Sequence, residues 1–151
     1  MTTIKKISGE ILLYLYLIQR QDAGKLKNIM LTFGTRALPD RKSTLQLDSR
    51  SESVFKINDF DFYSDNDIYN ALVYLYDSSL IEYKESRYNT GLHLINFKVT
   101  SSGINIVESI ERGSGERQNF NMTFNFNIKN NVTVESLLKT KFESIFKASA
   151  L

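Results

Sequence analysis

The chain has 151 residues, a net charge of +2, no cysteine and a single histidine, His93. The length is typical of one domain with its own core. The lack of cysteine excludes disulfides, thiolate metal sites and a cysteine nucleophile, and it suits a reducing compartment. A lone histidine also excludes a metal site with several histidine ligands. We therefore expect one core that folds without disulfides or a structural metal.

Charge is unevenly distributed along the chain. Residues 1–58 hold ten Lys and Arg against five Asp and Glu, residues 59–85 hold one against seven, and residues 86–151 hold eight against five. Lys and Arg supply most of the non-specific affinity of a protein for DNA phosphates. The acidic central block therefore disfavours contact with DNA, whereas the basic flanks favour it.

The first predicted element is a helix with Ser8 as its N-cap and Gly24 just past its end. Residues 11–18 contain no charged side chain, so this helix must be buried on more than one side. The apolar stretch is too short to span a bilayer, and no cleavage site of small residues follows it. We therefore expect a cytoplasmic protein that does not enter the membrane.

A polar segment follows this first region. Residues 25–33 are compatible with a short second helix, and residues 34–53 read as a long polar loop that contains the only proline, Pro39. Loops of this length in compact domains are usually functional or disordered. The cations of this loop are Arg36, Arg41, Lys42 and Arg50.

A helix is predicted to begin near Asp65. Ser64 and Asp67 have the spacing of a capping box with Asp in place of Glu, and acidic side chains in the first turn suit the helix dipole. One stripe of the helix is apolar and faces the core. The opposite stripe lacks basic residues and holds Asn66, Asn70, Val73, Tyr74 and Asp77. Asparagine reads adenine and tyrosine reaches phosphates, but such a stripe suits a protein partner equally well.

A hairpin is predicted next, with strands in "SSLIEYKES" and "LHLINFKVT" and a turn at residues 89–91. His93 has the same parity as Phe97 and Val99, so we expect it at the end of the inward face, as a structural residue. A further helix is predicted in "TSSGINIVESIERG", with Gly113 at its end.

The closely spaced aspartates of "DFDFYSDND" raise the question of a metal site. Counted from Asp59 on a calcium-loop template, position 6 is Ser64 where glycine is needed, and position 12 is Asn70 where glutamate is needed. The chain also lacks a glycine-rich phosphate loop and a serine nucleophile elbow. The sequence therefore predicts no metal site, no cofactor and no enzymatic activity.

The C-terminal region is predicted to form a strand and a helix. Large apolar residues alternate with Asn and Thr over residues 119–128, the period of a strand with one apolar face, and a helix follows in "VESLLKTKFESIF". So much apolar surface must pack on the first helix, on a second copy of the chain or on another protein. We expect the second, a homodimer, and its predicted interface is Phe120, Met122, Phe124, Phe126, Ile128, Leu138 and Phe142.

A resemblance to a known family covers residues 54–111. The run "FKINDFDFYSDNDIYNALVYLYDSSLIEYKES", followed by "FKVTSSGINIVESI", resembles the small winged-helix proteins of bacteria and their prophages. The shared features are an acidic helix start, a "YLYDSSLIEY"-type turn into the hairpin and a T-x-x-G that opens the next helix. The resemblance implies a protein of a phage or mobile element, in some cases a regulator.

These expectations describe an α+β protein with a winged helix-turn-helix domain at residues 1–113 and a strand and helix appended at 114–151. The first functional hypothesis is a DNA-binding regulator of transcription. The alternative is an adaptor or inhibitor that binds a host or phage protein through the acidic, tyrosine-rich helix. In the first hypothesis, double-stranded DNA is contacted by Asn66, Asn70, Tyr74, Lys84, Arg87, Asn89, Arg36, Arg41, Lys42 and Arg50.

Overall fold

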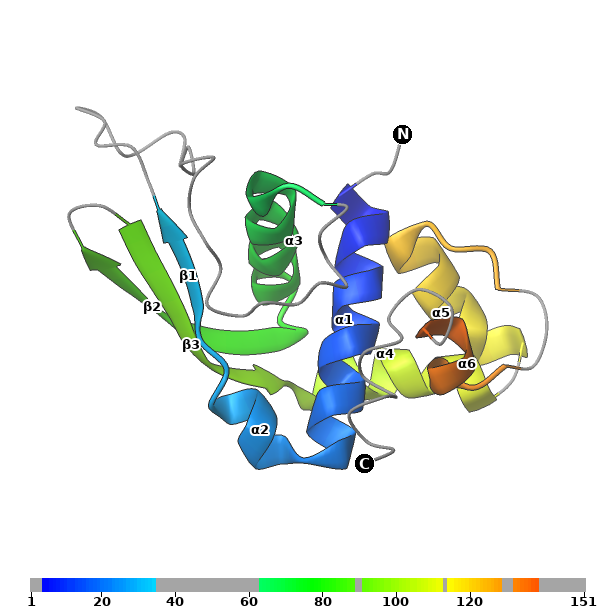
Figure 1. Ribbon diagram of the computed structural model, residues 1–151. Helices are drawn as coiled ribbons and strands as arrows, with labels where there is room; N and C mark the ends of the chain where they lie inside the picture. The colour runs from blue at the N-terminus through cyan, green and yellow to red at the C-terminus, as the bar shows by residue number, and fades with distance from the viewer. Residues whose placement is uncertain (1–3, 35–62, 89–90, 113, 129–131, 139–151) are drawn as a thin grey trace.

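One long helix, α1 (Ile4–Gln21), runs through the centre of the fold, with a small sheet on one side and a group of helices on the other (Figure 1). The computed structural model describes residues 4–34, 63–88, 91–112, 114–128 and 132–138, and over these residues the chain is an α+β protein. The other elements, in chain order, are α2 (Ala23–Lys27), β1 (Leu31–Gly34), α3 (Asp65–Asp77), β2 (Ile81–Tyr88), β3 (Gly91–Val99), α4 (Ser101–Arg112), α5 (Ser114–Phe124) and α6 (Val134–Leu138).

Helix α1 is covered on all sides, because residues 7–18 are all buried. It contacts α3 on the sheet side and α4, α5 and α6 on the other side (Figure 1). The prediction that this helix is buried on more than one side is therefore confirmed, and the covering elements belong to the same chain. Among the described residues, none of the helices has the length and apolar character needed to cross a membrane.

The start of α1 differs from the prediction, because Ser8 is not its N-cap. The helix begins one turn earlier, at Ile4, and Ser8 lies in its buried interior. The Ser8 hydroxyl donates a hydrogen bond to the carbonyl oxygen of Ile4 at 2.6 Å. A serine inside a helix commonly makes this bond to the residue four positions earlier, so its polar group is satisfied without capping.

The predicted helix at residues 25–33 is correct only in its first part. The carboxylate of Asp22 caps α2 by accepting hydrogen bonds from the N–H groups of Gly24 and Lys25. After α2 the chain becomes extended, and β1 pairs with β3, with Leu31 opposite Leu94. The extended form prevails because Leu31 and its neighbours gain cross-strand partners, which local sequence does not reveal.

The sheet has three antiparallel strands in the order β1-β3-β2. The predicted hairpin is confirmed, with Ile81 opposite Val99 at its base and Tyr88 opposite Gly91 near its tip. Strand β2 lies at one edge of this sheet, and α3 lies beside it (Figure 1).

A bulge in β3 changes which of its residues face the core. Glu82 pairs with Lys98 and Lys84 pairs with Ile95, so one residue of β2 lies opposite two residues of β3. Asn96, which lies in the bulge, has a φ of 59°. A left-handed residue is typical of one common type of β-bulge.

The bulge explains why the predicted face of His93 is wrong. Leu92 and Leu94 are buried before the bulge, and Phe97 and Val99 are buried after it. His93 is half-buried and belongs to the opposite face of the strand, because successive side chains alternate between faces. The extra residue in the bulge reverses the parity on which the prediction rested.

Capping side chains fix the starts of α3 and α4. Ser64 is the N-cap of α3, as predicted, and its hydroxyl accepts a hydrogen bond from the N–H of Asp67 at 3.1 Å. Thr100 precedes α4, and its hydroxyl accepts from the N–H of Gly103 at 3.1 Å and donates to the carbonyl oxygen of Ser79 at 2.7 Å. The threonine of the T-x-x-G pattern therefore caps α4 and holds it against the end of α3.

Helix α5 lies where the sequence predicts the first part of a strand, so the expected C-terminal strand is wrong. Phe120 and Phe124 are fully buried, whereas Met122 between them is 78% exposed. Arg117 and Asn121 are buried as well. Spacings of three and four residues between the buried positions are those of a helix.

Asparagines end and secure α5. Asn125 has a φ of 56°, and the N–H of Phe126 donates to the carbonyl oxygen of Asn121 at 3.0 Å, as in a Schellman motif. The Asn121 side chain also exchanges two hydrogen bonds with the backbone of Ile128, at 3.1 and 3.2 Å. Asn125 thus ends α5, and Asn121 binds the segment that follows it.

Candidate functional site

The outer stripe of α3 has the orientation that the sequence predicts. Ala71, Leu72 and Leu75 are buried in the core on the side of α1, and Asn66 and Asn70 are exposed. Tyr74 and Val73 are half-buried and Asp77 is exposed. Helix α3 therefore presents amide, phenol and carboxylate groups at the surface, with no basic side chain among them.

The two predicted cations of β2 lie on different faces of the hairpin. Arg87 and Glu85 share one face, since residues two apart along a strand point the same way, and Tyr69 of α3 reaches Glu85 on that face. Arg87 Nη2 lies 3.4 Å from Glu85 Oε2. Lys84 has the opposite parity and is exposed. The structure therefore brings Arg87 to the side of α3, but not Lys84.

The remaining cations of the DNA hypothesis fall outside the described residues. These cations are Arg36, Arg41, Lys42 and Arg50, and the predicted turn residue Asn89 lies outside the described residues as well. Within residues 63–88 the chain holds five Asp and Glu against two Lys and Arg. The described part of the candidate interface is therefore acidic.

A row of tyrosines joins α3 to β2, and sequence reasoning did not identify it. The hydroxyl of Tyr69 donates to Glu85 Oε1 at 3.1 Å. The ring of Tyr76 lies on that of Tyr83, with centroids 4.9 Å apart. We call Tyr69, Tyr76, Asp77, Tyr83 and Glu85 the α3–β2 seam. The seven-residue spacing of Tyr69 and Tyr76 places both on one side of α3, which was the available signal.

Tyr69 and Tyr83 of this region are protonated over the physiological pH range. Burial raises the pKa of Tyr69 to about 12, and the charge of Glu85 and its hydrogen bond add to this effect. Burial likewise raises the pKa of Tyr83, with contributions from Glu85 and Asp77 among its neighbours. These phenols therefore act as neutral hydrogen-bond donors and aromatic surfaces, not as bases near neutral pH.

A partly buried contact ties the start of α3 to α1. Glu10 is buried in α1, and the hydroxyl of Tyr63 donates a hydrogen bond to its carboxylate. Burial, followed by the hydrogen bond and the charge of Glu10, raises the pKa of Tyr63. Because Tyr63 immediately precedes the capping residue Ser64, this bond helps to fix where α3 begins.

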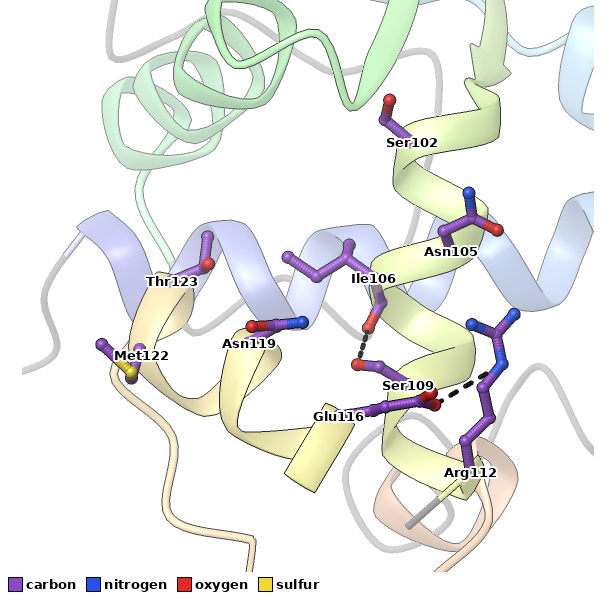
Figure 2. A pocket seen from close by; sticks show the side chains of 9 residues that line it. All are labelled: Ser102, Asn105, Ile106, Ser109, Arg112, Glu116, Asn119, Met122 and Thr123. Carbon is purple, nitrogen blue, oxygen red and sulfur yellow. Dashed lines mark hydrogen bonds and ion pairs between the residues drawn. The ribbon is translucent and has the colours of Figure 1, made fainter. Parts of the chain in front are cut away.

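An open groove of about 620 Å³ lies between α4 and α5 (Figure 2). Five of its nine lining residues carry a hydroxyl or an amide group. Arg112 lies at one end, with Nη2 3.3 Å from Glu108 and Nε 4.0 Å from Glu116. Ser109 donates to the carbonyl oxygen of Ile106 at 2.5 Å. The charged groups at this groove face each other, and the arrangement does not pair a nucleophile with a base.

Metal-ligating side chains are dispersed in the part of the chain that the structure describes. No three of its His, Asp and Glu side chains lie together as a metal site would require. Among these residues, the groups that remain as candidates for function are the outer stripe of α3 and the α3–β2 seam.

The residues of the predicted dimer interface do not share one face. Phe120 and Phe124 are buried within the chain, Met122 is exposed, and Phe126 is half-buried, with its ring centroid 5.2 Å from that of Phe120. Ile128 is half-buried, Leu138 ends α6, and Phe142 lies outside the described residues. The common apolar face expected from a strand is therefore absent over residues 120–128.

The chain was compared with known proteins at three levels. No protein-family model, no curated protein and no solved structure matches it.

Proposed function

We propose that the chain is a winged-helix protein that binds double-stranded DNA and regulates transcription in a phage or mobile element. The observation that carries this proposal is the order of elements around the sheet. Helix α3 leads directly into the β2–β3 hairpin, and β1, from before α3, pairs with the inner strand to give the order β1-β3-β2. A helix followed by such a hairpin is the arrangement with which winged-helix proteins enter the major groove.

In this proposal the outer stripe of α3 reads bases. Asn70 is exposed near the middle of the helix, and an asparagine amide pairs with adenine through two hydrogen bonds. Tyr74 and Arg87 lie on the helix and on the hairpin beside it, where they contact phosphates. The loop cations Arg41 and Lys42 supply additional charge.

The acidic character of residues 63–88 supports a second candidate, a winged-helix adaptor that binds another protein. Five carboxylates against two cations repel a phosphate backbone at short range. Tyrosine is enriched at protein interfaces. The two candidates are separated by measuring DNA binding directly.

The test is titration of the full chain with a labelled pool of random duplexes, followed by selection of the preferred sequence. We expect binding at low salt that weakens steeply as salt rises, because counterions are released from the phosphates. Asn70→Ala should weaken binding to the selected sequence about tenfold, since a bidentate contact to a base is worth about 1–3 kcal/mol.

Asn105→Ala is the matched control for Asn70→Ala. Asn105 is an exposed asparagine on a helix outside the proposed interface, so its removal should leave binding unchanged. The stoichiometry of the complex also reports whether one chain or a homodimer binds. No binding at low salt, or equal losses in the two variants, would overturn the DNA proposal.

A further inference from the structure

The α3–β2 seam combines an exposed aromatic ring with carboxylates. Tyr76 is 47% exposed although its ring packs on Tyr83, which in turn packs on Phe97 with centroids 5.5 Å apart. The exposed ring is therefore backed by a row of aromatic side chains that extends into the core. A supported ring of this kind offers a rigid flat surface to a partner at little cost in side-chain entropy.

Two carboxylates flank this aromatic row. Asp77 follows Tyr76 in the chain and is exposed, as is Glu85 on β2. Glu85 accepts the hydrogen bond from the hydroxyl of Tyr69, and Asp77 is the last residue of α3. Asp77 makes no ion pair with the residues that the structure describes.

The position of Asp77 is unfavourable for the helix itself. It is the last residue of α3, and the last turn carries no basic side chain. The carbonyl groups at a helix C-terminus already give that end a partial negative charge, so a carboxylate there destabilises the helix. The combined negative charge attracts a cation from outside.

A guanidinium group matches this surface better than an ammonium group. It is planar, stacks on an aromatic ring and donates two parallel hydrogen bonds to a carboxylate. The chain already contains one guanidinium–carboxylate ion pair at the rim of the seam, where Arg87 Nη2 lies 3.4 Å from Glu85 Oε2. Asp77 and the exposed face of Tyr76 provide the place for a second guanidinium.

We propose that the α3–β2 seam binds an arginine-bearing basic segment of a partner protein, with one guanidinium stacked on Tyr76 and paired with Asp77. The inference gives the second candidate function a surface and a class of ligand, and it does not require DNA binding. Duplex DNA is disfavoured at the seam, because its phosphates meet two carboxylates and the negative end of α3.

The test uses a labelled peptide of alternating arginine and glycine, titrated into the full chain. We expect saturable binding that weakens with salt. The same peptide with citrulline in place of arginine is neutral and nearly isosteric, and it should not bind. Tyr76→Ala should weaken binding about three- to fivefold, the loss of a cation–π contact at an exposed site, whereas Tyr76→Phe keeps the ring and should retain the affinity.

Asp77→Asn separates a binding role from a structural one. It should weaken peptide binding and raise the midpoint of unfolding, because it removes a charge that the helix end disfavours. Glu82→Gln removes an exposed carboxylate from the other face of β2 and should leave peptide affinity unchanged. Unfolding curves of all variants identify any that fail to fold.

The inference is overturned if the wild-type chain does not bind the arginine peptide or binds the citrulline peptide equally well. Equal losses in Asp77→Asn and Glu82→Gln would also overturn it, since they indicate general charge attraction. A duplex titrated into the same variants keeps the two proposals apart: peptide binding without DNA binding rejects the DNA proposal alone. DNA binding without peptide binding rejects the seam.

Discussion

Ser79 adopts a left-handed backbone conformation where α3 ends. Its φ is 62°, and the N–H of the next residue, Leu80, donates to the carbonyl oxygen of Leu75 at 3.0 Å, as in a Schellman motif. This conformation suits glycine, because a Cβ atom makes it less favourable. The carbonyl oxygen of Ser79 also accepts the hydrogen bond from Thr100, so the backbone must keep this shape.

Ser79→Gly should stabilise the protein by about 1 kcal/mol, since glycine adopts the left-handed conformation without strain. The side chain of Ser79 is exposed, so little is lost with it. Ser78, at the neighbouring position, has a φ of −83°, and Ser78→Gly should therefore give no gain. Urea unfolding of both variants measures the difference, and equal effects would show that the conformation of Ser79 is not strained.

Gly103 is required by close approach between α4 and the chain before β2. A Cβ atom at this position would lie 2.2 Å from the carbonyl oxygen of Leu80 and 2.7 Å from Val99. Backbone must move to relieve such a clash, so Gly103→Ala should destabilise the protein by about 3 kcal/mol. Gly115→Ala is the control, because nothing lies within 4 Å of its Cβ position, and alanine favours the helix by up to about 1 kcal/mol. Thermal unfolding that ranks the two variants the other way would contradict this packing.

At the scale of elements, α5 illustrates what sequence alone leaves ambiguous. Phe120 and Phe124 are four residues apart, a spacing that satisfies both a strand face and a helix stripe. Met122 is hydrophobic and lies two residues from each of these phenylalanines, which favours a strand with one apolar face, yet its side chain is exposed. Packing against α1 favours the helix. Phe124 approaches Gly9 of α1 so closely that a Cβ atom added at Gly9 would lie only 2.7 Å from the Cβ atom of Phe124.

Substitution of Phe124 and Met122 distinguishes the helix from a strand. Phe124→Ala should cost about 3–5 kcal/mol, because it opens a cavity against α1. Met122→Ala should change the unfolding free energy by less than about 0.5 kcal/mol, as expected at an exposed position. In a strand with one buried face the two losses would be similar. Chemical denaturation of the two variants gives the answer.

Other elements were predictable to the extent that their determinants are local. The capping of α3 by Ser64 and of α4 by Thr100 involves residues three apart in the chain, so sequence reveals both helix starts. Strand β1 depends on β3, some sixty residues later, and the α3–β2 seam depends on how a helix lies over a strand. The bulge at Asn96 reversed the parity for His93. These features arise from tertiary contacts, and the seven-residue spacing of Tyr69 and Tyr76 in the seam is the one local signal noted for them.

At the scale of the whole molecule, the half-buried Tyr69 affects how stability responds to alkali. The pKa of Tyr69 is about 12 in the folded state, against about 10 in an unfolded chain. The folded state therefore holds this proton more tightly, and the resulting stability is fully present below pH 10. It is lost as pH rises from 10 towards 12, because the unfolded state ionises first.

Tyr69→Phe should therefore make the unfolding free energy fall less steeply with pH between about 10 and 12. Urea unfolding at a series of pH values measures the slope, and the absorbance of tyrosinate follows ionisation directly. The protein in concentrated urea serves as the control for unperturbed tyrosines. Identical slopes for wild type and variant would show that Tyr69 ionises alike in both states.

The central position of α1 also has a consequence during synthesis. The ribosome makes α1 long before α5 begins at Ser114, an interval of roughly 5–20 s at typical elongation rates. Throughout this interval the apolar residues of α1 lack part of their native cover. Pulse-labelled nascent chains halted before α5 should therefore bind chaperones and resist compaction, and chains released after α6 should lose that binding.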